Sequence, residues 1–129
     1  MMIQNPINLI EEWMSAVNSH DIERLLAFYD EKAVLIPTFS NRLLDDPEKI
    51  RDYFTNLCDR KELQITLHEK KSLVQPIRNN IYSLSGIYCW HFMVDGELLS
   101  FEARFSYVID LDLTNPVIHH HSSQIPRML

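Results

Sequence analysis

The chain has only two glycines and two cysteines among its 129 residues, and it has no hydrophobic run long enough to cross a membrane. So few glycines exclude the glycine-rich loops that hold phosphates and the fingerprint that binds dinucleotides. Two cysteines do not make a disulfide framework. Cys58 falls in a helical pattern and Cys89 in a strand pattern, so we expect two buried free thiols in a reducing, cytoplasmic compartment.

Clustered positive charge is also scarce. The 12 Lys and Arg are scattered and are outnumbered by 18 Asp and Glu, which gives a net charge of −6. Because binding to phosphates requires clustered Lys and Arg, we expect no nucleic-acid partner. The N-terminus lacks the charged-then-apolar pattern of a signal, so no membrane partner is expected either. Length and a hydrophobic fraction of 46% fit a single domain over residues 1–129.

The strongest pattern in the chain is a hairpin over residues 81–109, centred on Asp95-Gly96. A two-residue type I′ turn requires positive φ at both of these positions, and it places Val94 opposite Glu97. This register sorts the two strands into unlike faces. The apolar face carries Leu84, Tyr88, Trp90, Phe92, Leu99, Phe101, Phe105 and Tyr107. The other face carries Ser85, His91, Ser100, Glu102, Arg104 and Ser106, together with Ile87, Cys89 and Met93.

The apolar face of this hairpin must be buried against helices or against a partner. The polar face is either solvated or the lining of a cavity, and the pattern alone leaves both possibilities open.

The remaining segments predict three helices and three further strands. Helices are expected from Asn5-Pro6, from Asp21 and from Asp46-Pro47, because each site offers a cap and the first and third offer proline at the first helical position. Strands are expected over 33–36, 63–68 and 117–123. Helices followed by a run of strands predict an α+β fold, with the helices packed on one face of a curved antiparallel sheet.

Several segments resemble the nuclear transport factor 2-like (SnoaL-like) superfamily. They are Trp13 through His20-Asp21, Tyr29-Asp30, residues 33–38, residues 50–54, Arg104, and residues 117–123 with their His-His-His-Ser-Ser sequence. Within this superfamily, the sequences of these segments most resemble the branch formed by the association domain of calcium/calmodulin-dependent protein kinase II and its stand-alone bacterial relatives.

The resemblance implies a cone-shaped α+β domain with three N-terminal helices on a curved antiparallel sheet that has a mixed edge. It also implies self-assembly into at least a dimer. In the kinase this domain assembles subunits and carries a pocket lined by arginines. Arg104 matches the arginine of the fourth strand. Ser122 stands where the arginine after the family's His-x-His would be, and Tyr88 or a neighbour replaces the one in the third strand.

The resemblance therefore implies a pocket in which Arg104 is a fixed cation oriented by Glu102. The further lining residues are His91, His120, Ser122, Tyr29 and Trp13. The alternative is a solvated ion pair on an exposed strand, which contributes little. If Arg104 faces the pocket, the opposite face of the hairpin is left for a subunit partner. The predicted interface residues are Tyr88, Trp90, Phe101, Phe105 and Tyr107.

Two kinds of chemistry remain as weaker alternatives. His119 and His121 share a strand face and could chelate zinc with His68 or His91, but local hydrogen bonding explains them better, so no metal and no cofactor are expected. Glu102, His91, His120 or Tyr29 could serve acid–base catalysis in an isomerase, cyclase or dehydratase of this superfamily. No catalytic dyad is recognisable among them.

The sequence thus predicts a stand-alone homo-oligomeric cone domain that binds a small organic ligand, with an anion favoured by Arg104. A pure association module is the first alternative, and a small-substrate enzyme is the second.

Overall fold

The computed structural model describes residues 3–126. Its elements, in chain order, are α1 (Pro6–Asn18), α2 (Ile22–Leu26), β1 (Tyr29–Ile36), α3 (Pro47–Cys58), β2 (Gln64–Leu67), the 3₁₀ turn η1 (Glu69–Lys71), β3 (Leu73–Arg78), β4 (Ile81–Val94), β5 (Glu97–Asp110) and β6 (Val117–Gln124). The predicted α+β order, with the helices concentrated before the main sheet, is confirmed.

The three helices begin where the capping residues predict. The side chains of Asn5, Asp21 and Asp46 each accept a hydrogen bond from the backbone N–H three residues later. This bond satisfies one of the amide groups that a helix start otherwise leaves unpaired. Pro6 and Pro47 occupy the first helical positions, where a missing N–H costs nothing.

The six strands form one sheet in the order β1-β6-β5-β4-β2, and β3 also pairs with β4. The hairpin register is confirmed, with Val94 opposite Glu97 and Ile87 opposite Arg104. Asp95 and Gly96 have φ values of 49° and 83°, as a type I′ turn requires. All pairs are antiparallel except β1 with β6, which makes the predicted mixed edge.

Two strands differ from the prediction. The first strand begins at Tyr29 rather than at Ala33, because Tyr29 already pairs with Val117 across the parallel edge. β3 was not predicted, since Pro76 interrupts its pattern. Proline is tolerated there because β3 pairs with β4 alone and its other side is a free edge.

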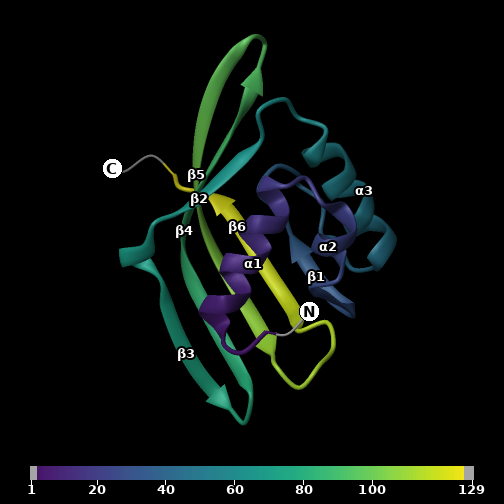
Figure 1. Ribbon diagram of the computed structural model, residues 1–129. Coiled ribbons are helices and arrows are strands. Elements are labelled where there is room, and N and C mark those ends of the chain that lie inside the picture. Colours follow the sequence, from purple (N-terminus) through teal and green to yellow (C-terminus); the bar gives the residue numbers. More distant parts are fainter. Residues whose placement is uncertain (1–2, 127–129) are drawn as a thin grey trace.

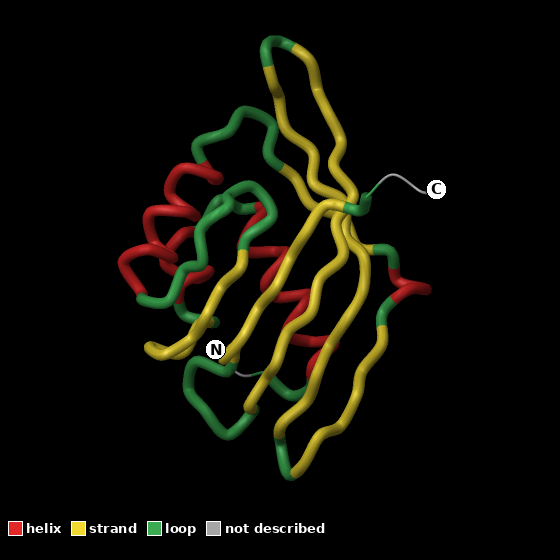
Figure 2. Tube along the Cα trace, turned by 180° about the vertical axis from the view of Figure 1, so that it is seen from behind, coloured by secondary structure: helices red, strands yellow, loops and turns green. Residues whose placement is uncertain are grey.

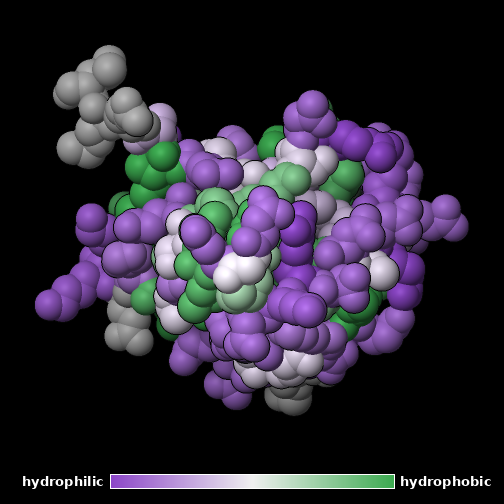
Figure 3. All heavy atoms as spheres, turned by 90° about the horizontal axis from the view of Figure 1, so that it is seen from above, coloured by the Kyte–Doolittle hydropathy of each residue, from purple (hydrophilic) through white to green (hydrophobic). Residues whose placement is uncertain are grey.

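The helices cover one face of the sheet, as Figure 1 shows with α1 lying across the strands. Figure 2, seen from behind, shows the strands of the opposite face without a helix over them. We call the covered side the inner face and the other side the outer face. In the view of Figure 3, hydrophilic residues cover most of the surface and hydrophobic residues form smaller patches. Within residues 3–126, no helix combines the length and the apolar character needed to cross a bilayer.

Candidate functional site

A hydrogen-bonded chain of aromatic side chains fills the space between α1 and the inner face. The indole Nε1–H of Trp13 donates to the hydroxyl of Tyr29 at 3.1 Å. That hydroxyl lies 2.8 Å from Nδ1 of His120, and Nε2 of His120 lies 3.2 Å from the hydroxyl of Tyr88. These four residues come from α1, β1, β6 and β4. Their hydrogen bonds therefore connect the helix to three strands of the sheet.

A neutral His120 with its proton on Nε2 satisfies these bonds. The Tyr29 hydroxyl accepts from Trp13 and can donate its own O–H to Nδ1, while Nε2–H can donate to the hydroxyl of Tyr88. Burial lowers the pKa of His120 well below its ordinary value of 6.5, and His119 and His121 lower it further. Tyr107 stacks on the ring, with the two centroids 3.9 Å apart. His120 is thus a neutral, enclosed hydrogen-bonding group.

The interior leaves almost no free space. The cavity bordered by Trp13, His120 and Ser122 has a volume of about 10 Å³, which is about enough for one water molecule. Of the predicted pocket residues, the structure therefore brings Trp13, Tyr29, His120 and Ser122 together around an interior filled by side chains. A catalytic histidine would need access to substrate and water, and His120 is only 2% exposed.

The other three predicted pocket residues lie on the wrong face. Arg104 and Glu102 are exposed on the outer face, and His91 lies there too, hydrogen-bonded to Ser100 across the hairpin at 2.9 Å. The reason is strand alternation: the buried neighbours Ala103 and Phe105 point inward, so Arg104 between them points outward. The prediction that Arg104, Glu102 and His91 line the hollow is wrong in its geometry.

The aromatic face was correspondingly misassigned to a partner. Tyr88, Trp90, Phe105 and Tyr107 are buried within a single copy of the chain, and Phe101 is half-buried in contact with Phe39 and Phe92. Trp13 of α1 stacks on Tyr88 with the ring centroids 5.7 Å apart. The helices of the same chain therefore take the place that was predicted for the partner.

The histidines of β6 divide between the two faces. His119 and His121 flank the buried His120 and project outward, beside Val108 and Ser106 of β5. His68 lies 3.5 Å from Glu102 on the same outer face. Among the described residues, no three His, Cys, Asp or Glu side chains are placed to hold a metal ion together.

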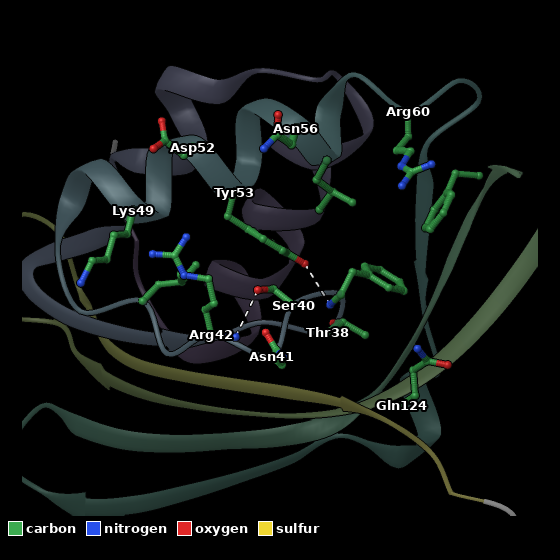
Figure 4. Close-up of a pocket in the computed structure, with 14 residues that line it drawn as sticks. Thr38, Ser40, Asn41, Arg42, Lys49, Asp52, Tyr53, Asn56, Arg60 and Gln124 are labelled. Carbon is green, nitrogen blue, oxygen red and sulfur yellow. Dashed lines mark hydrogen bonds between the residues drawn. The ribbon is translucent and has the colours of Figure 1, made fainter.

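The structure contains a cleft that the sequence did not predict, between α3 and the loop of residues 38–45 (Figure 4). We call it the α3 groove. Its volume is about 870 Å³, which is within the range of small-molecule sites. The lining residues are Thr38, Phe39, Ser40, Asn41, Arg42, Leu44, Lys49, Asp52, Tyr53, Asn56, Leu57, Arg60, Phe92 and Gln124. Twelve of these residues lie between Thr38 and Arg60, and Phe92 and Gln124 join them from β4 and β6. The local patterns predicted the helix here but not how the preceding loop lies against it.

The α3 groove carries an excess of positive charge in an acidic protein. Arg42, Lys49 and Arg60 border it, against one carboxylate, that of Asp52. Lys49 is already bound to Asp45, 2.8 Å away. Within residues 3–126, Arg42 and Arg60 have no carboxylate within salt-bridge distance.

Aromatic surface lies beside this charge. The guanidinium of Arg60 lies 5.5 Å from the centre of the Phe92 ring, and Phe39 meets the same ring edge-on at 5.1 Å. In Figure 4, Arg60 projects from beyond the end of α3 while Arg42 reaches from the loop, so the two cations approach the groove from different sides. The arrangement suits an anion that also has an apolar part.

A curved sheet with helices on one face is the cone fold of nuclear transport factor 2-like domains, and in this chain aromatic side chains fill the interior. The family model described as "Calcium/calmodulin dependent protein kinase II association domain" matches residues 3–126. The chain therefore belongs to this family, as the sequence resemblance indicated.

One solved structure supports the fold assignment. It is the crystal structure of a protein from Xanthomonas campestris, described as an association domain of the same kind, and it matches with a TM-score of 0.84. The match covers 98% of this chain and 96% of that chain at 20% sequence identity, a level at which the likeness establishes the fold alone. None of the curated proteins compared with the chain matches it.

Proposed function

We propose that this chain is a self-association module that forms at least a homodimer through the outer face of its sheet. The family is described as an association domain, and the closed interior favours this function over catalysis or binding inside the cone. We also propose a cytoplasmic location for the protein. Its two cysteines, Cys58 and Cys89, are both free thiols, which supports a reducing compartment.

The composition of the outer face supports its use as an interface between identical copies. Ile87, Cys89, Met93 and Val108 are half-buried there, although no helix of the described chain covers them. Apolar side chains that are partly exposed on a sheet face without a helix over it can pack against a second copy. Across β4 and β5, Ser85 is paired with Ser106, while Arg104 and Glu102 stand opposite Ile87 and Cys89.

Charge on this face is self-complementary. Glu102 and Arg104 are two residues apart on the same side of β5, and both are exposed. In a twofold-symmetric dimer every contact occurs twice with the partners exchanged. A twofold axis passing near Ala103 would therefore place Glu102 of each copy against Arg104 of the other. Arg104 thus acquires an interface role in place of the pocket role that the sequence predicted.

We expect Ile87→Glu to convert a wild-type dimer into a monomer. An unpaired carboxylate buried in the interface costs about 3–5 kcal/mol, so the dimer dissociation constant should rise by more than about 100-fold. Light scattering coupled to size-exclusion chromatography at micromolar concentration measures the change, and circular dichroism checks the fold. Leu113→Glu is the matched control, because Leu113 is 38% exposed in the β5–β6 connection. A monomeric wild type, or a dimeric Ile87→Glu variant, would contradict the proposed interface.

We propose small-molecule binding as a second function and place it in the α3 groove. The observation in its favour is the pair of arginines, Arg42 and Arg60, that border a groove of ligand size without carboxylate partners in the described chain. Such unpaired guanidinium groups favour an anion, which they can bind through two parallel hydrogen bonds each.

Benzoate tests this proposal with a simple anion. It should raise the melting temperature of the wild type, and Arg60→Gln should weaken its binding by about 10- to 150-fold, because one charged hydrogen bond contributes about 1.5–3 kcal/mol. Arg104→Gln is the matched control and should bind benzoate as the wild type does. Isothermal titration calorimetry measures the affinities. Loss of binding in Arg104→Gln but not in Arg60→Gln would place the ligand elsewhere.

A further inference from the structure

Histidine is concentrated on the outer face of the sheet. The chain has six histidines, and four of them lie on this face (Figure 2): His68, His91, His119 and His121. Of the other two, His20 is bonded to the carbonyl of Leu63 at 3.1 Å and His120 is buried in the core. Imidazole is the side chain whose charge ordinarily changes between pH 5 and 8. The proposed dimer interface therefore gains positive charge as the pH falls through this range.

Three of these histidines surround the pair formed by Glu102 and Arg104. Nε2 of His68 lies 3.5 Å from a carboxylate oxygen of Glu102. His91 stands opposite the residue two positions before Glu102, and His121 stands opposite the residue two positions after Arg104. Diagonal neighbours at this offset are within reach of long side chains. The charge on the histidines is therefore felt by the two side chains that we place across the twofold axis.

Few other charged groups face these histidines. Cys89 stands opposite Glu102, and burial, together with that carboxylate, raises the pKa of its thiol, which stays neutral. The β1 residues paired with the two outward histidines of β6 are apolar, and β2 carries no charge. Further charged side chains on η1, β3 and this side of β5 are Lys70, Lys71, Arg78 and Asp110. Among the described side chains, only Glu102 brings a carboxylate within salt-bridge distance of a histidine.

Protonation of these histidines opposes the proposed contact in two ways. While His68 is neutral, Glu102 is free to pair with Arg104 of the second copy. Once protonated, His68 is a cation 3.5 Å from Glu102 and competes for the same carboxylate within its own chain. Protonated histidines also bring positive charge of both copies together, and like charges that face each other disfavour association. Acid therefore weakens an attraction and adds a repulsion at the same surface.

We propose that the outer face is a pH-sensitive interface, in which the four histidines are neutral in the dimer and their protonation separates the two copies. This inference rests on the outer-face dimer proposed above and adds its regulation. The separated copies bind protons that the dimer excludes, so a falling pH favours separation.

The dimer dissociation constant, measured by analytical ultracentrifugation at pH 7.5 and at pH 6.0, tests this proposal. One imidazole per copy that stays neutral in the dimer excludes two protons, which raises the constant about tenfold over this range. A variant that combines His68→Gln, His91→Gln, His119→Asn and His121→Asn should show no such rise. His20→Asn is the matched control and should respond to pH as the wild type does. Circular dichroism at both pH values checks that the chain stays folded.

The outcomes separate the pH response from the dimer itself. An equal dissociation constant at the two pH values overturns the pH response and leaves the dimer standing, whereas a monomeric wild type at pH 7.5 overturns both. A wild-type response in the fourfold variant assigns the effect to other groups and also overturns the proposal. If that variant does not fold, His68→Gln alone decides, because it should show a smaller rise than the wild type. A full rise in His68→Gln would then count against the competition for Glu102 and overturn the proposal.

Discussion

Trp13→Ala is expected to lower the free energy of unfolding by about 3–5 kcal/mol, the usual cost of truncating a buried tryptophan. Trp13 is 1% exposed and stacks on Tyr88, and its ring also meets those of Trp90 and Tyr107 edge-on. Alanine would leave a large cavity at the centre of the cone and would remove the hydrogen bond to Tyr29. Urea-induced unfolding followed by circular dichroism measures the loss.

Trp13→Phe separates packing from hydrogen bonding. Phenylalanine keeps most of the apolar ring and removes only the N–H that donates to Tyr29, so it should cost about 1–2 kcal/mol. Ile7→Ala, on the exposed side of the start of α1, should cost less than either. If Trp13→Ala cost no more than Ile7→Ala, the aromatic network would not be the centre of the core.

The stability of the wild type should fall as the pH drops from about 6.5 to about 5. His120 is neutral in the fold, and burial lowers its pKa well below 6.5, whereas in the unfolded chain the imidazole regains its ordinary pKa. Below pH 6.5 the unfolded state therefore binds a proton that the folded state does not. Each pH unit in this window should lower the free energy of unfolding by up to about 1.4 kcal/mol.

His120→Phe tests the source of this pH dependence. The variant starts from lower stability, because the hydroxyls of Tyr29 and Tyr88 lose their histidine partner, but its stability should change much less between pH 6.5 and 5. The carboxylates with lowered pKa, Glu23 and Asp45, act at more acidic pH, since their ordinary values are 4.5 and 3.8. Equal slopes in the variant and the wild type would assign the effect to other groups.

The cations near a cavity in this chain are not at the positions of the pocket arginines of the kinase branch. Two of the arginines that line the pocket in the kinase branch are expected on strand positions where this chain has Ser122 and Tyr88 or a neighbour of Tyr88, and both Ser122 and Tyr88 are buried in the closed interior. The cations that remain near a cavity come instead from α3, the segment after it and the loop before it. Membership of the family therefore predicted the fold and association but not the location of the α3 groove.

Local chemistry in the sequence was enough to predict most of the elements. The caps at Asn5, Asp21 and Asp46 act within three residues, and the Asp95-Gly96 turn fixes the register of its hairpin. β3 was missed because its support is not local. Its pattern is broken by Pro76, and only pairing with β4 makes it a strand.

The sequence by itself determined the register of the hairpin and the separation of its side chains into two faces, because alternation along a strand is a local property. Only the tertiary structure decided which face the helices cover. That choice depends on Trp13 and the rest of α1 packing against Tyr88 and its neighbours, contacts between residues far apart in the chain. It buried the aromatic rings, turned Arg104 outward and left the cations of α3 and its loop around the groove.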